Sequence, residues 1–148
     1  MPAGISRDEM VLNNDFAPTF ADLAGLPPPD SVDGRSFASL LDRTQRNDPT
    51  SWRTAFEIRN WDNMRKETSY QAVSSVPPYR AVRTQRYLYV EYAAGERELY
   101  DLRKDPYELY SLHDSADKGL ISKLGRRLDA LRDCAGEGCR AAEDGRPK

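Results

Sequence analysis

Few residues of this chain have side chains suited to acid–base or metal chemistry. Its 148 residues include one histidine, which excludes a zinc site with several imidazole ligands, and two cysteines, which exclude Cys₄ and iron–sulfur sites. His113 stands beside Asp114 and could act as a general acid or base. A lone histidine in a polar linker is more commonly a solvent-exposed residue, and we favour that interpretation.

The two cysteines are close in sequence. Cys134 and Cys139 enclose a segment that contains Gly136 and Gly138. They could be free thiols or half of a metal site. We favour a short disulfide, because glycines let so tight a ring close and a metal ion would need more donors. A disulfide would point to an extracytoplasmic protein.

One further group could bind a ligand. Arg59, Asn60 and Trp61 are consecutive and combine a guanidinium, an amide and an aromatic plane, which are the groups that sugar-binding sites use. These three residues are our binding candidates, although a structural role is the favoured alternative.

Charge and hydropathy exclude other classes of protein. The 22 Lys and Arg residues against 24 Asp and Glu give a net charge of −2, which argues against strong nonspecific nucleic-acid binding. No apolar run approaches the ~18 residues of a membrane helix. The charged segment 1–9 does not resemble a signal peptide. We therefore expect no targeting signal in this polypeptide alone, and its localisation stays unknown.

Helical signals dominate the first third of the chain. Asn13 or Asn14 can cap a helix over 14–24, and Gly25 supplies a left-handed stop. A proline-rich extended segment follows, and then a short helix is expected over 35–41. The polar residues 42–51 are typical of a surface linker.

In the rest of the chain the apolar residues first alternate with a period of two, as in strands, and then recur at helical spacing. Alternating residues predict four strands and leucines at spacings of three and four predict a final helix, with the expected ranges 56–59, 79–83, 87–92, 97–102 and 117–133. Residues 60–78 show no clear period. The fold class is therefore α+β, with about four antiparallel strands packed against a C-terminal amphipathic helix and a helix before them.

The strand over 87–92 should be buried on both faces. It carries large side chains on each of them, with Leu88, Val90 and Tyr92 on one and Tyr87 and Tyr89 on the other. The final helix can cover one face, but the chain has little left to cover the second. We therefore expect part of the cover to be missing.

Four segments carry a family resemblance in the same order. They are NNDFAPTFADLAGLP (13–27), DGRSF (33–37), YRAVRT (79–84) and ELYDLRKDPYEL (98–109). Over about residues 2–140 the chain resembles the C-terminal third of a type I sulfatase, in the branch of arylsulfatases and N-acetylglucosamine-6-sulfatases. The resemblance implies that residues 1–51 are the end of an α/β catalytic domain plus a linker, and that 52–148 form the small C-terminal domain. It also implies a partner, the catalytic domain in cis or in trans, which would cover the second face of the sheet.

The reacting groups of that family are not found in this sequence. The resemblance implies that enzymes of this family use a formylglycine nucleophile, which is made from the Cys or Ser of a Cys/Ser-x-Pro/Ala-x-Arg motif. It also implies a divalent cation, calcium, at the active site. The segment that starts at Cys139 has Glu143 in place of the arginine, and those that start at Cys134 and Ser75 also fail. The family's metal ligands belong to segments upstream. We therefore expect no cofactor in this chain and no sulfate-ester hydrolysis by it alone.

The resemblance also gives expectations for individual residues. Loops of the small domain help to rim the substrate pocket in the family, so Arg59, Asn60 and Trp61 are candidate rim residues. The segment from Asp101 to Leu112 is expected to be structural, with Leu102, Leu109 and Leu112 as core anchors and Glu108 capping or pairing locally.

Three interpretations of the chain's role remain open. The first is a truncated or separately encoded C-terminal portion of a sulfatase, whose parent would be secreted or periplasmic. The alternative is a noncatalytic binder of sulfated or acidic glycans. The third is a nonfunctional gene remnant.

Overall fold

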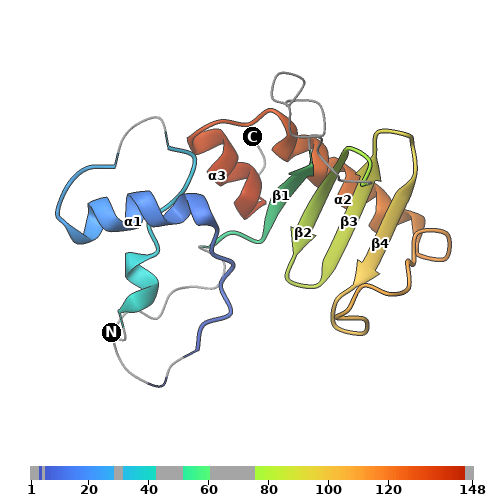
Figure 1. Ribbon diagram of the computed structural model, residues 1–148, viewed down its shortest axis with the longest axis horizontal. Coiled ribbons are helices and arrows are strands. Elements are labelled where there is room, and N and C mark those ends of the chain that lie inside the picture. Colours follow the sequence, from blue (N-terminus) through green and yellow to red (C-terminus); the bar gives the residue numbers. More distant parts are fainter. Residues whose placement is uncertain (1–3, 5, 29–31, 43–51, 61–75, 146–148) are drawn as a thin grey trace, which may run out of the picture. The chain divides into compact units, whose positions relative to one another are not determined.

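A computed structural model describes residues 4, 6–28, 32–42, 52–60 and 76–145. These residues form two compact units (Figure 1). Unit 1 comprises residues 1–55 and 133–148, and unit 2 comprises residues 56–132. The elements are η1 (Asn13–Asp15), α1 (Phe16–Leu23), η2 (Ala38–Leu41), β1 (Ala55–Asn60), β2 (Tyr79–Thr84), β3 (Tyr87–Tyr92), β4 (Arg97–Asp101), α2 (Lys118–Arg132) and α3 (Glu137–Asp144).

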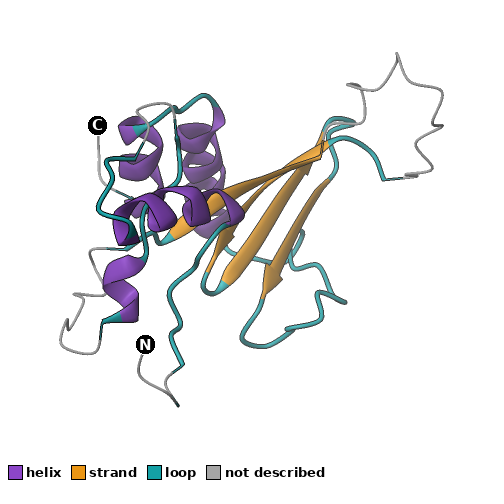
Figure 2. Cartoon of the chain, turned by 60° about the vertical axis from the view of Figure 1, so that its left-hand side comes forward, coloured by secondary structure: helices purple, strands orange, loops and turns teal. Residues whose placement is uncertain are grey.

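Unit 2 is the expected antiparallel sheet with a helix against it. The strand order is β1-β2-β3-β4, and β3 pairs antiparallel with both β2 and β4 (Figure 2). This confirms the α+β class. Short turns join β2 to β3 and β3 to β4. Strands that are joined in this way usually pair as neighbours, which explains why the order in this part of the sheet follows the sequence.

One face of the sheet is covered by α2. The register places Val82, Tyr89 and Leu99 side by side on this face, and each is at most 1% exposed. Of the apolar residues whose spacing predicts this helix, Leu124, Leu128 and Leu131 are buried, and Leu120 and Ile121 are partly buried. Burying one such side chain contributes about 2 kcal/mol, so this layer is the main core of unit 2.

The opposite face of the sheet is lined by tyrosines. Leu88, Val90 and Ala81 form its buried centre, and partly buried side chains surround them, namely Ile58, Tyr79, Tyr92, Tyr100 and Leu102. We call this surface the tyrosine face. The expectation that the strand over 87–92 is buried on both faces is confirmed at its centre, with Tyr89 1% exposed on one face and Leu88 and Val90 8% and 5% exposed on the other.

Unit 1 begins with the expected helix. α1 spans Phe16–Leu23, holds Pro18 in its first turn and ends before Gly25, whose φ of 72° is the left-handed stop. The expected asparagine cap is wrong. Residues 13–15 form the 3-10 turn η1 instead, and Asp15 occupies the N-cap position with no side-chain capping bond.

The short helix expected over 35–41 is reduced to the 3-10 turn η2. The backbone N–H of Arg35 donates to Asp15 Oδ1 at 3.0 Å, and that of Phe37 donates to Thr19 Oγ1 at 3.0 Å. Since these N–H groups bond to the α1 segment, residues 35–37 are held out of a helix. The expected linker over 42–51 lies almost wholly outside the described residues.

The last helix, α3, was not expected. It has eight residues, too few to show a helical period, and it starts beside Gly136 and Gly138. It belongs to unit 1, whereas the expected domain 52–148 groups it with the sheet. The division into a catalytic-domain tail and a small domain stays a prediction.

Candidate functional site

The candidate rim residues lie at the end of β1. Arg59 forms an ion pair with Glu57 at 2.6 Å and donates to the backbone carbonyl of Arg132. Asn60 Nδ2 lies 3.4 Å from the carbonyl oxygens of both Val76 and Pro77. Successive residues of a strand point to opposite faces, so the Arg59 and Asn60 side chains do not converge on one point. Trp61 lies outside the described residues.

Asn60 borders a cavity at this end of the sheet. The cavity measures about 230 Å³ and is also lined by Tyr79, Tyr92, Arg80 and Arg132 among others. Its basic groups already have partners, because Arg80 Nε donates to Glu57 Oε1 at 2.6 Å and Arg132 pairs with Asp129 at 3.2 Å. The cavity therefore combines aromatic rings with basic groups that are already neutralised.

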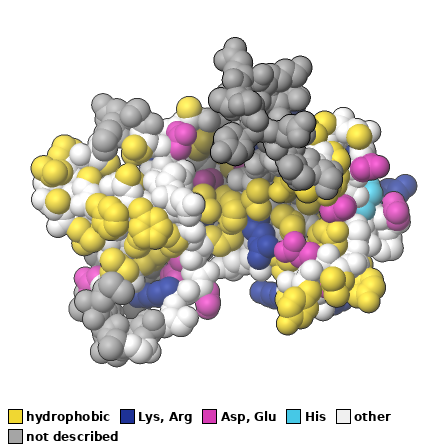
Figure 3. Space-filling model, viewed as in Figure 1, with side chains coloured by type: hydrophobic (Ala, Val, Ile, Leu, Met, Phe, Trp, Pro, Cys, Tyr) yellow, Lys and Arg dark blue, Asp and Glu magenta, His cyan; other side chains and the backbone are white. Residues whose placement is uncertain are grey.

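The tyrosine face forms a second, larger hollow of about 350 Å³. Hydrophobic side chains gather over the strands in the space-filling view, interrupted by a few charged ones (Figure 3). The charged residues that line the hollow are Arg83, Glu98 and Glu108. Arg83 pairs with Glu108 at 3.1 Å, which leaves Glu98 as the unneutralised charge of this surface among the described residues.

Two tyrosines hold Glu98 by hydrogen bonds. Tyr92 Oη donates to Glu98 Oε2 at 3.3 Å. Burial and a hydrogen bond to Glu98 raise the pKa of Tyr100 to about 12, and burial together with the charge of Glu98 raises the pKa of Tyr92. Both phenols therefore stay protonated at neutral pH and can donate to this carboxylate.

The segment after β4 is a tight turn with apolar residues on its outside. Asp105 Oδ2 accepts the backbone N–H groups of Leu109 and Tyr110 at 2.8 Å each, and Glu108 adopts a φ of 58°. This turn directs Leu109 outward, where it is 67% exposed, so the expectation that it is a core anchor is wrong. The partner of Glu108 is Arg83, which is distant in sequence rather than local.

His113 is half-buried, so its expected exposure is also wrong. Its ring centroid lies 6.4 Å from that of Tyr89, and its buried Nδ1 has no hydrogen-bond partner in the part of the chain that the structure describes. Asp114 beside it is exposed. The Ser111 hydroxyl accepts the backbone N–H of His113 at 3.4 Å, and we assign the imidazole no chemistry.

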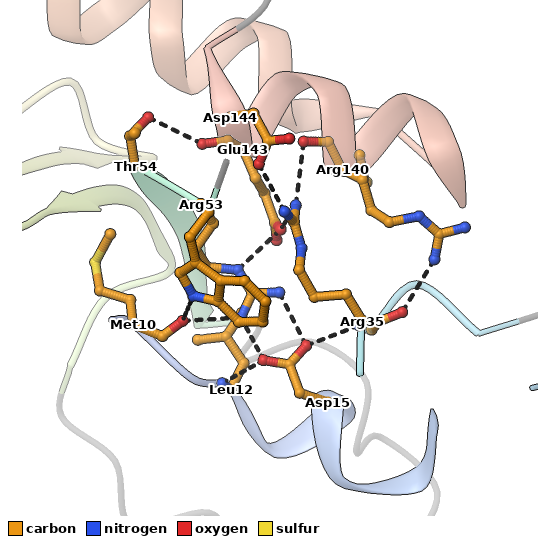
Figure 4. A network of polar contacts seen from close by, with 12 residues as sticks. Met10, Leu12, Asp15, Arg35, Arg53, Thr54, Arg140, Glu143 and Asp144 are labelled. Atoms are coloured by element: carbon orange, nitrogen blue, oxygen red, sulfur yellow. Dashed lines mark hydrogen bonds and ion pairs between the residues drawn. The ribbon is translucent and has the colours of Figure 1, made fainter. Parts of the chain in front are cut away.

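Sequence analysis missed the most heavily charged feature of unit 1, a buried cluster of Asp15, Arg35, Arg53, Glu143 and Asp144 (Figure 4). We call it the arginine cluster. Its residues come from four separate segments, so no spacing in the sequence could reveal it.

Arg53 is the centre of this cluster and its side chain is fully buried. Both terminal nitrogens donate to Asp15, with Nη2 2.9 Å from Oδ1, and Nε donates to Glu143 Oε2 at 2.9 Å. Arg35 binds the same Glu143 oxygen at 2.8 Å and Asp144 Oδ1 at 2.7 Å. Both guanidiniums also lie over the Trp52 ring, at 5.5 and 5.7 Å from its centroid.

The pKa shifts agree with this pairing. Burial alone would raise the pKa of Asp15, but hydrogen bonds from Arg53 and from the backbone N–H groups of Arg35 and Leu12 outweigh it and lower the pKa. Burial would lower the pKa of Arg53, and its carboxylate partners Asp15 and Glu143 raise it instead. Each carboxylate of the cluster is paired with a guanidinium, and the buried Nε of Arg35 is the atom of the cluster without a partner among the described residues. We therefore interpret the cluster as structural.

The expected disulfide is confirmed, because Cys134 and Cys139 are bonded to each other. Among the described residues, no group of three His, Cys, Asp or Glu side chains is placed to hold a metal ion. In the same residues, no helix is long and apolar enough to cross a bilayer.

Comparison with known proteins identifies the family. Residues 1–134 match the family described as N-sulphoglucosamine sulphohydrolase, C-terminal. An arylsulfatase of Chlamydomonas reinhardtii is 35% identical over 144 residues, and an N-acetylglucosamine-6-O-sulfatase of Bacteroides thetaiotaomicron is 30% identical over 117 residues. The chain therefore belongs to the sulfatase family, and it corresponds to the C-terminal part of these enzymes.

The match covers most of this chain but only a small part of its relatives. It covers 86% and 78% of the chain, but only 22% and 20% of the two enzymes. A solved structure of a protein bound to its substrate D-glucosamine-2-N,6-O-disulfate is 29% identical, with a TM-score of 0.65, and the match covers 78% of this chain and 22% of that one. The chain thus spans about a fifth of the length of these relatives.

Proposed function

We propose that this chain is the part of a sulfatase that completes the fold and rims the substrate pocket, and that it hydrolyses no sulfate ester without an α/β catalytic domain. Support comes from the family and from the fraction of the relatives that the chain spans. Support also comes from the sequence, which lacks the nucleophile motif expected of the family.

The observation that carries the proposal is the apolar side of α1. Phe16, Phe20 and Leu23 recur at helical spacing and are 46%, 63% and 63% exposed. A helix of a self-sufficient domain would bury this side against its own core. An α/β domain that continued from α1 would cover it, and the exposed residues therefore support packing of the catalytic domain on this side of α1.

The tyrosine face is the second surface that we assign to the catalytic domain. It is apolar at its centre, and among the described residues that line it Glu98 is the charge without an ion-pair partner. Tyr92 and Tyr100 donate hydrogen bonds to Glu98 but do not neutralise it, so a basic side chain on the partner would offset the cost of burying this charge. We therefore infer that the catalytic domain presents an apolar surface with one basic side chain here.

The same charges argue against the alternative, a noncatalytic binder of sulfated glycans. Sulfate groups would require unpaired basic side chains, as polyanion recognition does. The hollow of the tyrosine face instead has two carboxylates and one arginine, and that arginine is already paired. A titration with heparin oligosaccharides at low salt should leave the spectrum of the chain unchanged, and saturable binding would favour the alternative.

Asn60 is the stronger of the described rim candidates. Its amide borders a cavity, whereas the Arg59 guanidinium is held by Glu57 and by a backbone carbonyl. In the assembled enzyme we expect Asn60 and Trp61 to contact the part of the substrate away from the sulfate group that reacts.

The experiment is made on the 148-residue chain and uses the exposed side of α1. The chain alone should release no sulfate from an aryl sulfate, and it should bind an apolar dye or self-associate. Phe20→Glu should weaken both dye binding and self-association without lowering the unfolding midpoint, because Phe20 is mostly exposed and the tyrosine face is left unchanged.

Ala130→Glu is the matched control, since it adds the same charge at an exposed position of α2. It should leave dye binding and association unchanged. A monomeric chain that binds no dye would contradict the proposal, and so would sulfate release by material free of contaminating activity.

A further inference from the structure

The disulfide lies at the beginning of α3. Cys134 precedes the helix, Cys139 lies in its first turn, and both are partly exposed. α3 has eight residues, and helices shorter than about 12 residues are marginal on their own in water. Its stability must therefore come from the disulfide and from contacts with the rest of unit 1.

Those contacts are made mainly to the arginine cluster. Arg35 donates to the backbone carbonyl of Arg140 at 3.1 Å, to Glu143 at 2.8 Å and to Asp144 at 2.7 Å. Glu143 also accepts from Arg53, and its carbonyl oxygen accepts the backbone N–H of Thr54 at 2.9 Å. The C-terminal turn of α3 thus supplies two of the three carboxylates of this buried cluster.

The start of α3 is joined to the same segment of unit 1. The backbone N–H of Gly136 donates to Asp33 Oδ1 at 2.7 Å, and Arg140 Nη1 donates to the Gly34 carbonyl at 3.0 Å. Gly136 has a φ of 52°, a conformation that a freely moving chain adopts only part of the time. The disulfide restricts the residues that must hold this geometry.

We propose that the Cys134–Cys139 disulfide is a redox latch, which keeps α3 packed against Arg35 and Arg53 while it is closed and releases the helix when it is reduced. The reductant is a dithiol. One of its thiolates attacks a cysteine sulfur, and its second thiol resolves the mixed disulfide. The protein's S–S bond gains two electrons and two protons and becomes two thiols, while the dithiol becomes a disulfide.

The size of the effect follows from the short ring. The two cysteines are 5 residues apart, and the chain entropy of so small a loop corresponds to roughly a 30-fold change in the equilibrium between packed and released α3. The released state leaves Arg35 without Glu143 and Asp144, and it leaves Arg53 with Asp15 as its carboxylate partner and with the Met10 carbonyl. The inference rests only on the geometry of unit 1 and stands apart from the proposed function.

Hydrogen exchange on the whole chain, with and without dithiothreitol, tests the latch. Reduction should accelerate exchange roughly 30-fold for the amides of α3 and for the Thr54 amide. The amides of β3 and β4 should not change, because unit 2 contains no cysteine. The variant with Cys134→Ser and Cys139→Ser should reproduce the reduced pattern without any reductant.

A second measurement works in the opposite direction. If closing the disulfide favours the packing of α3, the packing must favour the disulfide by the same factor. Glu143→Gln should therefore make the disulfide more easily reduced in a dithiothreitol equilibrium, with a shift of up to about 30-fold. Glu137→Gln, at an exposed position of the same helix, is the control and should cause no shift.

Three results would overturn the latch. The first is unchanged protection of α3 in protein whose two thiols are shown by alkylation to be free. The second is equal acceleration in both units, which would mean that reduction acts on the whole chain. The third is the same reduction equilibrium for Glu143→Gln and Glu137→Gln.

Discussion

Replacing Arg53 by methionine should be among the most damaging single changes in unit 1. Methionine keeps much of the length of the side chain but removes both guanidinium donors to Asp15 and the Nε donor to Glu143. Glu143 keeps Arg35 at 2.8 Å. Asp15 keeps the backbone N–H groups of Leu12 at 2.7 Å and Arg35 at 3.0 Å, but no cation that neutralises it directly.

The expected loss follows from the burial of Asp15. Its side chain is 0% exposed, so the substitution leaves an uncompensated carboxylate inside the protein. Removing one member of a buried pair costs about 3–5 kcal/mol. Adding Asp15→Asn to Arg53→Met removes that charge, so the double variant should be less destabilised than the sum of the two single variants, with a coupling of at least ~1 kcal/mol.

Urea unfolding followed by tryptophan fluorescence measures both quantities. Trp52 contacts Arg53 and reports on unit 1, and Trp61→Phe removes the second of the two tryptophans. The loss should also be smaller in acid. The Asp15 pKa is lowered by folding, so its contribution is complete above its ordinary value near 3.8 and is lost as the pH falls through the lower folded value. A loss below ~1 kcal/mol at neutral pH, or strictly additive variants, would refute the reasoning.

Four other substitutions test the remaining structure. Leu128→Ala should cost about 2–5 kcal/mol in urea unfolding, because the side chain is fully buried between α2 and the sheet, and a smaller loss would mean that the two are not packed. Burial first and a hydrogen bond to a carboxylate second raise the pKa of Tyr89 to about 12, so stability should be intact below pH ~10 and fall between ~10 and ~12. Tyr89→Phe should flatten that fall in thermal melts, and an unchanged slope would contradict the assignment. Gly34→Ala would place a Cβ against the backbone carbonyl of Asn14 and should lower the unfolding midpoint sharply, whereas Gly138→Ala meets no atom within 4 Å and should be neutral or stabilising.

The sheet and its helix were predictable because their signals are local. Strands β2, β3 and β4 alternate residue by residue and are joined by short turns, and α2 has leucines at helical spacing over fifteen residues. Each pattern can be seen in one stretch of sequence. The shortened helix at 38–41 was not predictable from local sequence. The N–H groups of Arg35 and Phe37 are bound by Asp15 and Thr19, which lie 20 and 18 residues earlier in the chain.

The candidate site was predictable only in part. The disulfide followed from two nearby cysteines with glycines between them. The separation of the Arg59 and Asn60 side chains follows from the β-strand, which extends to residue 60, whereas the expected strand ended at 59. The arginine cluster could not be predicted, because Asp15 and Arg53 are 38 residues apart and Arg53 and Glu143 are 90 apart. A buried ion pair of this kind has no sequence period.

The limits of the family match and of the packed unit do not coincide. The match ends at residue 134, before α3, but α3 contributes Glu143 and Asp144 to the arginine cluster. The carboxylates that neutralise Arg35 therefore come from a segment beyond the matched region. Since a buried guanidinium without a partner is costly, the first 55 residues cannot keep this packing without residues 137–144. The packing of unit 1 around Arg35 therefore depends on α3, near the end of the chain. The Cys134–Cys139 disulfide lies at the start of this helix.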